Sequence, residues 1–302
     1  MNTTRYQNFN CVSLDNESIN LLVTQSAGPR IISLSLRGEE NILANLPDFT
    51  VERPDGKTFR FYGGHRLWHA PEHMPRTYGI DDSPVEIVSI SNGLSVTQPI
   101  EPETGIQKSL HIELASNQPK VTIAHTLTNH NAWAVECAPW AITQFKTGGV
   151  AVLPLNRADS GLLPNRSLAI WSYTDLSSPC LHWGREHLWI QAQMTTSFKI
   201  GFPNPRGWMA YALNGNLFVK RAEYQANAVY YDFGSSSECY CCDSFLELET
   251  LAPITRLQPG AAVTHNETWE LYQTSASILS EQDIRALVKD LNLEQRLPYS
   301  GD

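Results

Sequence analysis

Short runs of β-favouring residues, each bounded by turn residues, recur along the whole chain, and this pattern limits the fold more than any other feature. Helical segments do not alternate with these runs, so the pattern predicts antiparallel sheets packed face to face, an all-β sandwich, and not a parallel α/β sheet. The expected strands cover residues 19–24, 30–37, 85–91, 106–114, 121–128, 188–194, 208–213, 217–224, 245–251 and 262–272.

The dipeptide Asn214-Gly215 is the strongest hairpin signal in the chain. It separates two apolar runs, and a tight two-residue turn needs positive φ angles, which asparagine and glycine accept most readily. We therefore expect two antiparallel strands joined at this turn.

One helix is expected, near the C-terminus, over about 280–293. Ser280 and Asp283 have the spacing of a capping box. The apolar residues that follow form one narrow stripe at helical spacing, so we expect this helix to pack on its own sandwich and not to bind a partner. The stripe consists of Ile284, Leu287, Val288 and Leu291.

The net charge excludes one class of partner. The chain has 302 residues and a formal charge of −9, with no run of lysine or arginine. Neutralising phosphates requires clustered basic residues, so nucleic acid is not an expected partner. No stretch has the apolar length that spans a bilayer, and the first eight residues lack the apolar core of a signal peptide. We therefore expect no membrane association and a cytoplasmic location.

Two clusters could suggest a metal site, but neither has the required spacing. Three of the six cysteines lie within 238–242, without a second pair nearby, and are expected as buried reduced thiols on a strand. His65, His69 and His73 are four residues apart, but Pro71 prevents one helix from carrying all three. A metal site built on a loop remains the alternative there, and we predict no metal.

The segment 245–251 indicates a strand with one acidic face. Glu247 and Glu249 are two residues apart among leucines, so both carboxylates leave the same side of a strand. Neighbouring carboxylates repel each other, which raises the pKa of at least one and suits it to proton transfer. A solvated outer face is the alternative interpretation.

The segment 63–72 has the composition of a binding site on a loop. Aromatic rings stack on the C–H face of a sugar, while arginine, histidine and carboxylate groups bind its hydroxyls. The glycine pair at its start allows close approach of the backbone. The alternative is a polar surface loop. The residues concerned are His65, Arg66, Trp68, His69 and Glu72.

Cations and an aromatic residue gather farther along the chain. Lys199, Arg206 and Trp208 border the expected Asn-Gly hairpin, and Lys220 lies on the strand after it. They could clamp an anionic or polyhydroxylated ligand, although cations at loop edges are ordinarily solvated. Asp232 could accept a hydroxyl proton or form a turn.

Several segments resemble the galactose-mutarotase-like (aldose 1-epimerase-like) superfamily. Residues 245–271 resemble its final strand with a catalytic Glu-Thr, a Pro-Gly turn and a closing Trp-x-Leu. Residues 28–43 resemble its opening hairpin, and 127–130 a strand end at the start of its middle section. With 62–72, the likeness is closest to an uncharacterised branch. The resemblance spans about 8–273 and implies a β-supersandwich, with residues 1–302 forming a single domain and ending in the short helix.

The resemblance also implies roles for particular residues. Glu249 matches the family's glutamate before threonine and becomes the candidate base, with Glu247 as its neighbour. The family's first histidine precedes a Gly-Gly pair where this chain has tyrosine, so the acid moves to His65 or His69. No cofactor is needed. The remaining residues expected to bind the substrate are Arg66, Trp68, Glu72, Trp208, Lys220 and Asp232.

Three functions follow from this resemblance. The first is an aldose 1-epimerase-like isomerase that interconverts the anomers of a small carbohydrate. Because the family histidines are not in their usual places, the second is a carbohydrate-binding protein without catalysis. The third is a two-carboxylate glycosidase or lyase. A histidine beside Glu249 favours the first, an aromatic floor without histidine the second, and two facing carboxylates the third.

Overall fold

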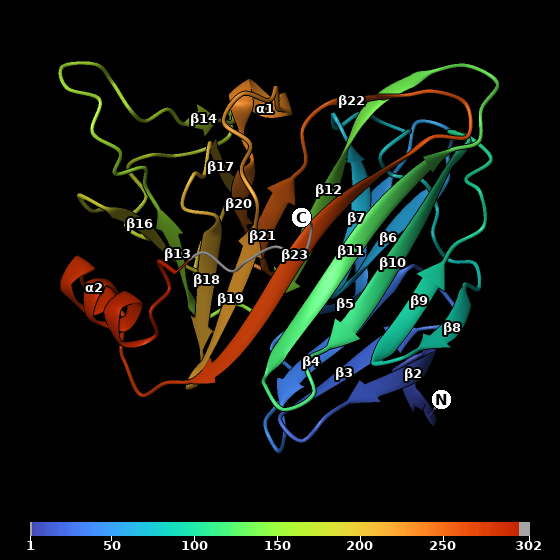
Figure 1. Ribbon diagram of the computed structural model, residues 1–302, viewed down its shortest axis with the longest axis horizontal. Helices are drawn as coiled ribbons and strands as arrows, with labels where there is room; N and C mark the ends of the chain where they lie inside the picture. The colour runs from blue at the N-terminus through green and yellow to red at the C-terminus, as the bar shows by residue number, and fades with distance from the viewer. Residues whose placement is uncertain (1, 296–302) are drawn as a thin grey trace.

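Two large antiparallel sheets packed face to face make up the body of the protein. The computed structural model describes residues 2–295, and Figure 1 shows the two sheets lying against each other. The all-β sandwich expected from the sequence is confirmed. The eleven-stranded sheet contains, in spatial order, β1 (Asn2–Tyr6), β2 (Phe9–Asp15), β3 (Ile19–Thr24), β4 (Arg30–Leu36), β7 (His65–Ala70), β12 (Val135–Phe145), β21 (Leu246–Leu251), β20 (Ser237–Cys241), β17 (Phe198–Phe202) and β14 (Ala169–Ile170), with β22 (Thr255–Leu257) paired to β12.

The second large sheet has ten strands and its own order. All pairs in it are antiparallel, and neighbouring strands are often close in sequence. In spatial order they are β15 (Leu181–Trp183), β16 (His187–Gln191), β13 (Val150–Pro154), β18 (Trp208–Leu213), β19 (Asn216–Ala222), β23 (Ala262–Gln273), β11 (Lys120–Asn129), β10 (Ile106–Leu114), β9 (Gly93–Thr97) and β8 (Glu86–Ile90).

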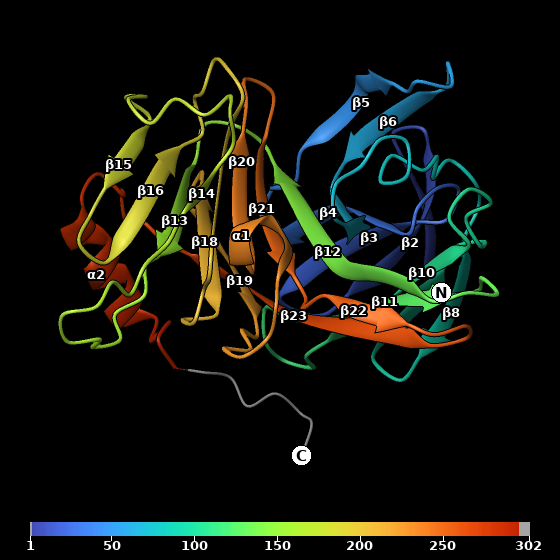
Figure 2. The same cartoon turned by 90° about the horizontal axis from the view of Figure 1, so that it is seen from above.

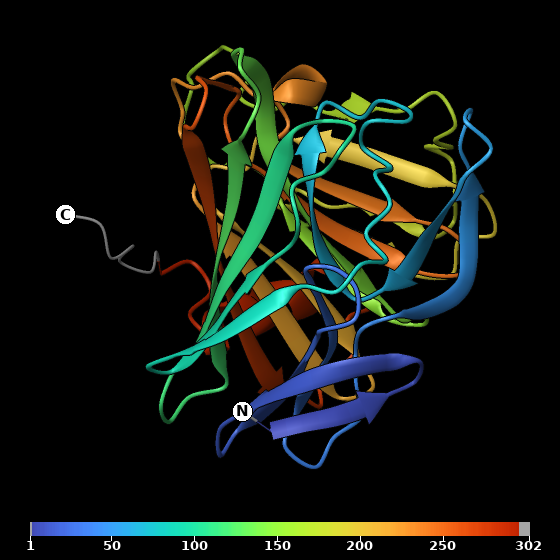
Figure 3. The ribbon, with the colours of Figure 1, turned by 90° about the vertical axis from the view of Figure 1, so that its right-hand side faces the viewer.

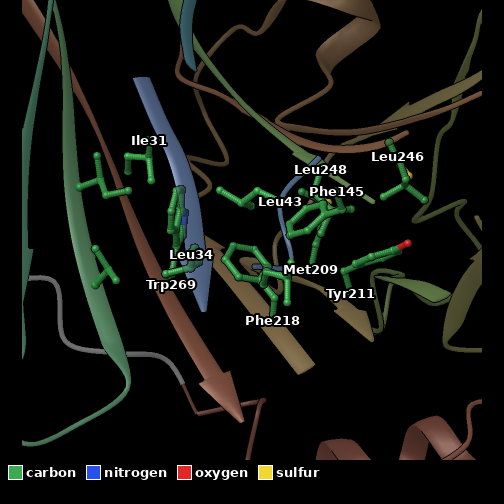
Figure 4. Packing of buried hydrophobic residues seen from close by; sticks show 14 of the residues in the cluster. Ile31, Leu34, Leu43, Phe145, Met209, Tyr211, Phe218, Leu246, Leu248 and Trp269 are labelled. Carbon is green, nitrogen blue, oxygen red and sulfur yellow. The ribbon is translucent and has the colours of Figure 1, made fainter. Parts of the chain in front are cut away.

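The hydrophobic core lies between the two sheets. Alternate residues of each strand point into this layer, so Leu246, Leu248 and Phe145 of one sheet belong to the same buried cluster as Phe218 and Trp269 of the other (Figure 4). Burying a large apolar side chain stabilises the fold by about 1.5–3 kcal/mol. Because alternate residues of each strand fill this layer, the remaining residues point to the outer faces of the sheets, where a binding site can form.

Turn residues place two of the connections. Asn214 and Gly215 have φ angles of 49° and 76° and join β18 to β19, as the sequence predicts. Gly63 and Gly64 also have positive φ, and a Cβ on Gly63 would lie 2.0 Å from the carbonyl oxygen of Ala44. The expected close backbone approach at this glycine pair is therefore present.

A helix covers part of the ten-stranded sheet. Helix α2 (Glu281–Asp290) begins at Ser280, which forms the expected capping box with Asp283. Its buried face, with Ile284 and Leu287, packs against Trp208 on the outer side of that sheet (Figure 2). The predicted terminal helix is confirmed. None of the helices within residues 2–295 is long and apolar enough to cross a membrane.

The structure corrects two expectations about loops. No strand was expected over residues 46–57, but β5 (Asn45–Glu52) pairs with β6 (Thr58–Gly63), and Pro47 is accommodated at a shift in the pairing register. Segment 63–72 was expected as a loop. It contains β7 instead, and all six of its residues are buried because both sides of this strand are covered.

The β5–β6 hairpin forms a separate two-stranded sheet. It stands off from the face of the eleven-stranded sheet that is turned away from the core (Figures 2 and 3). Its tip is tied down by Arg53, which donates to the Tyr78 carbonyl at 3.0 Å and pairs with Glu103 at 2.6 Å. The hairpin therefore roofs the space above the sheet.

Candidate functional site

A pocket of about 450 Å³ lies between this roof and the eleven-stranded sheet. Its floor comes from adjacent strands of the sheet, and Phe49, Val51 and Phe61 of the hairpin close it from above. Most of its lining is aromatic. The aromatic residues below and beside the roof are Trp68, Tyr78, Trp140, Trp171, Tyr173, Tyr240 and Phe245.

Strand alternation explains which residues reach the pocket. In β7, Arg66 and Trp68 line it, whereas Leu67 joins the core between the sheets. The same period in β21 places Glu247 in the pocket and Leu248 in the core. The acidic strand face expected from the sequence therefore faces the pocket.

Arg66 and Glu247 form a buried ion pair in the pocket. Arg66 Nη2 lies 3.1 Å from Glu247 Oε1, and the guanidinium carbon lies 4.2 Å from the ring centroid of Trp68. Arg66 Nε and Nη1 have no hydrogen-bond partner although both are buried. Burial raises the pKa of Glu247 to about 7, and Arg66 opposes this shift only in part. The pocket thus holds a carboxyl group that gains and loses a proton near neutral pH.

Lys199 of β17 links two further carboxylates at the pocket floor. Its ammonium nitrogen lies 2.7 Å from Glu238 Oε2 and 2.9 Å from Glu249 Oε2. Burial opposes the charge of Lys199, but these two carboxylates outweigh it and hold the pKa of the lysine well above its usual value. Trp140 Nε1 donates to the same Glu249 oxygen at 2.7 Å. Lys199 therefore stays protonated and fixes Glu249 in place.

Pairing register explains why this lysine is needed. Glu249 and Glu238 are direct partners on β21 and β20. Like charges directly opposite each other destabilise a sheet, so the ammonium between them is a requirement of the fold as well as a feature of the pocket. Burial also raises the pKa of Glu238 well above its usual value, with Lys199 opposing the shift.

Two predicted residues lie at the edge of this group. Glu72 lines the pocket and accepts a hydrogen bond from the Tyr78 hydroxyl. Asp232 lies in α1 (Tyr231–Gly234), a short turn in which Asp232 and Phe233 have left-handed φ angles of 51° and 58°. Burial raises the pKa of Asp232, while Lys199 opposes the shift. Asp232 therefore interacts electrostatically with the pocket floor.

The structure brings only some of the predicted site residues together. Arg66, Trp68, Glu72 and Glu247 line one pocket, and Glu249 lies at its floor between Trp140 and Lys199. Asp232 lies close by. The other predicted residues lie elsewhere, and no histidine is found among the pocket-lining residues of the described chain.

We expected four further residues to line the same pocket as Arg66 and Glu247, and the structure places them elsewhere. They are His65, His69, Trp208 and Lys220. His65 has the opposite parity to Arg66 in β7, so its side chain enters the layer between the sheets. His69 also turns away and lies 3.3 Å from Glu101. Trp208 packs beneath α2, and Lys220 is fully buried between the sheets.

His65 and Lys220 belong to a polar network inside the sandwich, which we call the interior network. His65 Nε2 lies 2.7 Å from His125 Nε2 of the other sheet, and its Nδ1 lies 2.9 Å from the Thr143 hydroxyl. Lys220 pairs with Glu267 at 2.9 Å and donates to the carbonyls of residues 141 and 248. The network is completed by Thr250, His265 and Trp269.

This interior network contains a set of groups that could ligate a cation. Ligand atoms of His65, His125 and Glu267 lie within 4.8 Å of one another. The Lys220 ammonium, however, already neutralises Glu267, and the two imidazoles share a hydrogen bond. A metal would have to displace these contacts and share a buried space with a positive charge, so the residues do not fit one.

The sequence reasoning missed several pocket residues. Lys199 was noticed as a cation at a loop edge but lies mid-strand, between buried Phe198 and Ile200. Tyr240 sits between buried cysteines in the same way. A single polar residue within an apolar run is the signal that could have identified both, because such a strand is covered on two sides.

Known structures share this fold at low sequence identity. A TPR-domain containing protein from Parabacteroides distasonis aligns with a TM-score of 0.60 and 16% identity over 90% of this chain, which spans 48% of that protein. A provisionally assigned aldose 1-epimerase from Klebsiella pneumoniae aligns at 0.58 and 10%, over 100% of this chain and 90% of that one. A galactose mutarotase-like protein from Lactobacillus casei aligns at 0.55 and 12%, over 87% of this chain and 100% of that one.

These likenesses show the fold, which is the galactose mutarotase-like fold expected from the sequence. At such identities they carry no activity across to this chain. No protein-family model and no curated protein matches the sequence. The chemistry of the pocket therefore has to be argued from its own residues.

Proposed function

We propose that the protein binds a small carbohydrate in the aromatic pocket. The observation that supports this most is the combination of ring faces with the Arg66–Glu247 pair in one space of about 450 Å³. Aromatic faces pack against the C–H side of a sugar, and an arginine beside a carboxylate supplies donors and acceptors for neighbouring hydroxyls. Of the three functions considered from the sequence, a pocket without histidine favours carbohydrate binding.

The unpaired donors of Arg66 point to the same use. Its Nε and Nη1 groups are buried without partners, and leaving such donors unpaired costs about 1–3 kcal/mol each. Sugar hydroxyls are acceptors that would remove this cost on binding. The guanidinium is held rigidly by Glu247 and by the Trp68 and Phe61 rings, so little conformational entropy is lost.

Calorimetry with a panel of aldoses tests this proposal. Arg66→Met is expected to weaken binding at least tenfold, and Tyr173→Ala, at a half-exposed position, severalfold. Arg256→Met on the exposed part of β22 is the matched control and should bind like the unmodified protein. Sugar affinity that neither pocket variant changes would contradict this site.

Anomer exchange is a second candidate function, favoured by the pKa of about 7 at Glu247. Glu247 replaces Glu249 as the candidate base, because Glu249 is fully buried and held by Lys199 and Trp140. Glu247 would accept the anomeric hydroxyl proton as the bond between C1 and the ring oxygen breaks, and solvent water would supply the proton that turns the ring oxygen into a hydroxyl. Reclosure on either face of C1 reverses these transfers: that hydroxyl loses its proton to solvent, and Glu247 returns its proton to the anomeric oxygen. Glu247→Gln should then slow exchange, followed by polarimetry, about 10²–10⁴-fold while sugar still binds. Unmodified protein that leaves exchange at the buffer rate would restrict the function to binding.

A further inference from the structure

More carboxyl groups than cationic side chains surround the pocket. Among the described residues that line it or contact its floor, five carboxyl groups face two cations. The carboxyl groups are Glu72, Asp232, Glu238, Glu247 and Glu249, and the cations are Arg66 and Lys199. Burial raises the pKa of Glu238 and Glu247, so these two are not both charged near neutral pH, but a cationic ligand beside them favours their charged forms. The pocket therefore favours positive charge and disfavours anions.

Two of these carboxyl groups, Glu238 and Glu249, have a buried oxygen without a hydrogen-bond partner. Glu249 is fully buried, and its Oε2 accepts from both Trp140 and Lys199, which line the pocket. Its Oε1 has no hydrogen-bond partner. Buried acceptors are normally satisfied, so this oxygen leaves uncompensated negative charge beneath the pocket floor.

The aromatic walls already stabilise ammonium and guanidinium groups. The Lys199 nitrogen lies 4.6 Å from the ring centroid of Trp140 and 4.7 Å from that of Trp171. Arg66 is held over Trp68 at 4.2 Å. Ring faces next to carboxylates are the surroundings in which proteins hold organic cations. Tyr173 and Tyr240 line the same pocket.

We propose that the ligand is an amino sugar, a sugar ring bearing an ammonium group, and that the pocket excludes sugar phosphates and uronates. This inference rests on the proposed carbohydrate-binding function. An ammonium group brings both the donor and the positive charge that the carboxylates lack, whereas a hydroxyl brings only the donor. A phosphate would add negative charge to a pocket that already has an excess of it.

Calorimetry with matched ligands tests the charge preference. The probes are glucosamine, galactosamine and mannosamine, each compared with its neutral hexose, its N-acetyl derivative and its hexose 6-phosphate. At least one amino sugar should bind tenfold or more tightly than its neutral and acetylated counterparts, and the phosphate should bind most weakly. The advantage should shrink as salt concentration rises, because it comes from charge.

Glu72→Gln provides a variant that should fold, since Glu72 is exposed at the pocket edge. It should weaken amino-sugar binding severalfold more than it weakens binding of the neutral sugar, because it removes a charge and keeps the shape of the side chain. Glu113→Gln, on an exposed position of β10 in the other sheet, is the matched control and should change neither. Neutral or phosphorylated sugars that bind as tightly as amino sugars would overturn this inference and leave the proposed function standing. Absence of binding by every probe would overturn both.

Discussion

The pocket and the interior network are built from the same strands, yet they treat polar groups in opposite ways. In β7 the side chain of His65 belongs to the network and that of Arg66 to the pocket. In β21 the side chain of Thr250 belongs to the network and that of Glu249 lies at the pocket floor. Within the described chain, no buried side-chain nitrogen or oxygen of the network lacks a partner, whereas Arg66 and Glu249 keep unpaired atoms. The saturated polar groups of the network hold the sheets together, whereas the unpaired donors of Arg66 line the pocket and are free to bind a ligand.

Removing the network's cation should have the largest effect on stability. Lys220→Met leaves Glu267 as an uncompensated buried charge, together with carbonyls that lose their donor. The free energy of unfolding should fall by about 3–5 kcal/mol in urea titrations. Lys289→Met, on the exposed side of α2, is the control and should cause no comparable loss.

A second variant separates lost charge balance from lost packing. Lys220→Met combined with Glu267→Gln removes both charges and should recover part of that stability. If the double variant is less stable by the sum of the two single losses, the pair is not coupled and the network is not held together by it.

The second largest effect on stability should come from acid, which favours protonation of the network's histidines. Burial lowers the pKa of His125 and His265 to about 3 each and that of His65 well below its usual value. Their ordinary pKa is 6.5, so between about pH 6.5 and 3 the unfolded chain binds protons that the folded chain does not. Stability is therefore present above pH 6.5 and falls with acid, by about 1.4 kcal/mol per pH unit for each histidine. Chemical unfolding between pH 5 and 7 measures this slope, and a flat profile would contradict the neutral buried histidines.

Glu247 should change the free energy of unfolding in the opposite direction over the same pH range: its contribution falls as the pH rises. Its folded pKa of about 7 exceeds the ordinary 4.5, so its contribution is present below pH 4.5 and is lost as pH rises to 7. Glu247→Gln removes that opposing contribution. Stability should then rise with pH more steeply than in the unmodified protein, by about 1.4 kcal/mol per unit. Glu113→Gln is the exposed control, and equal slopes for the two glutamine variants would disprove the raised pKa.

The sequence predicted the features that depend on local periodicity. Period-two alternation placed Leu246 and Leu248 in the core and Glu247 on the opposite face, and the Asn-Gly turn and capping box were found where expected. These predictions hold because each depends on a few neighbouring residues.

Features that depend on strand pairing could not be predicted in this way. The histidines at 65 and 69 suggested a loop site because polar residues usually mark exposed chain. In the folded protein β7 is covered on both faces, and His65 is satisfied by His125, 60 residues away. Nothing local to 63–72 specifies that partner. For the same reason the aromatic roof from β5 and β6 was missed, since its role depends on what lies beneath it.

The roof hairpin has a consequence for how this protein could be altered. Phe49, Val51 and Phe61 belong to a two-stranded ribbon that shares no ladder with either large sheet, while the charged floor is part of the eleven-stranded sheet. Changes at these three residues therefore leave the strand order of the large sheets and the core between them unchanged, although Phe61 packs against Trp68 of the floor. Directed evolution could therefore vary the pocket-lining residues of this hairpin independently of the sheets, provided that Arg53, which anchors its tip, is kept.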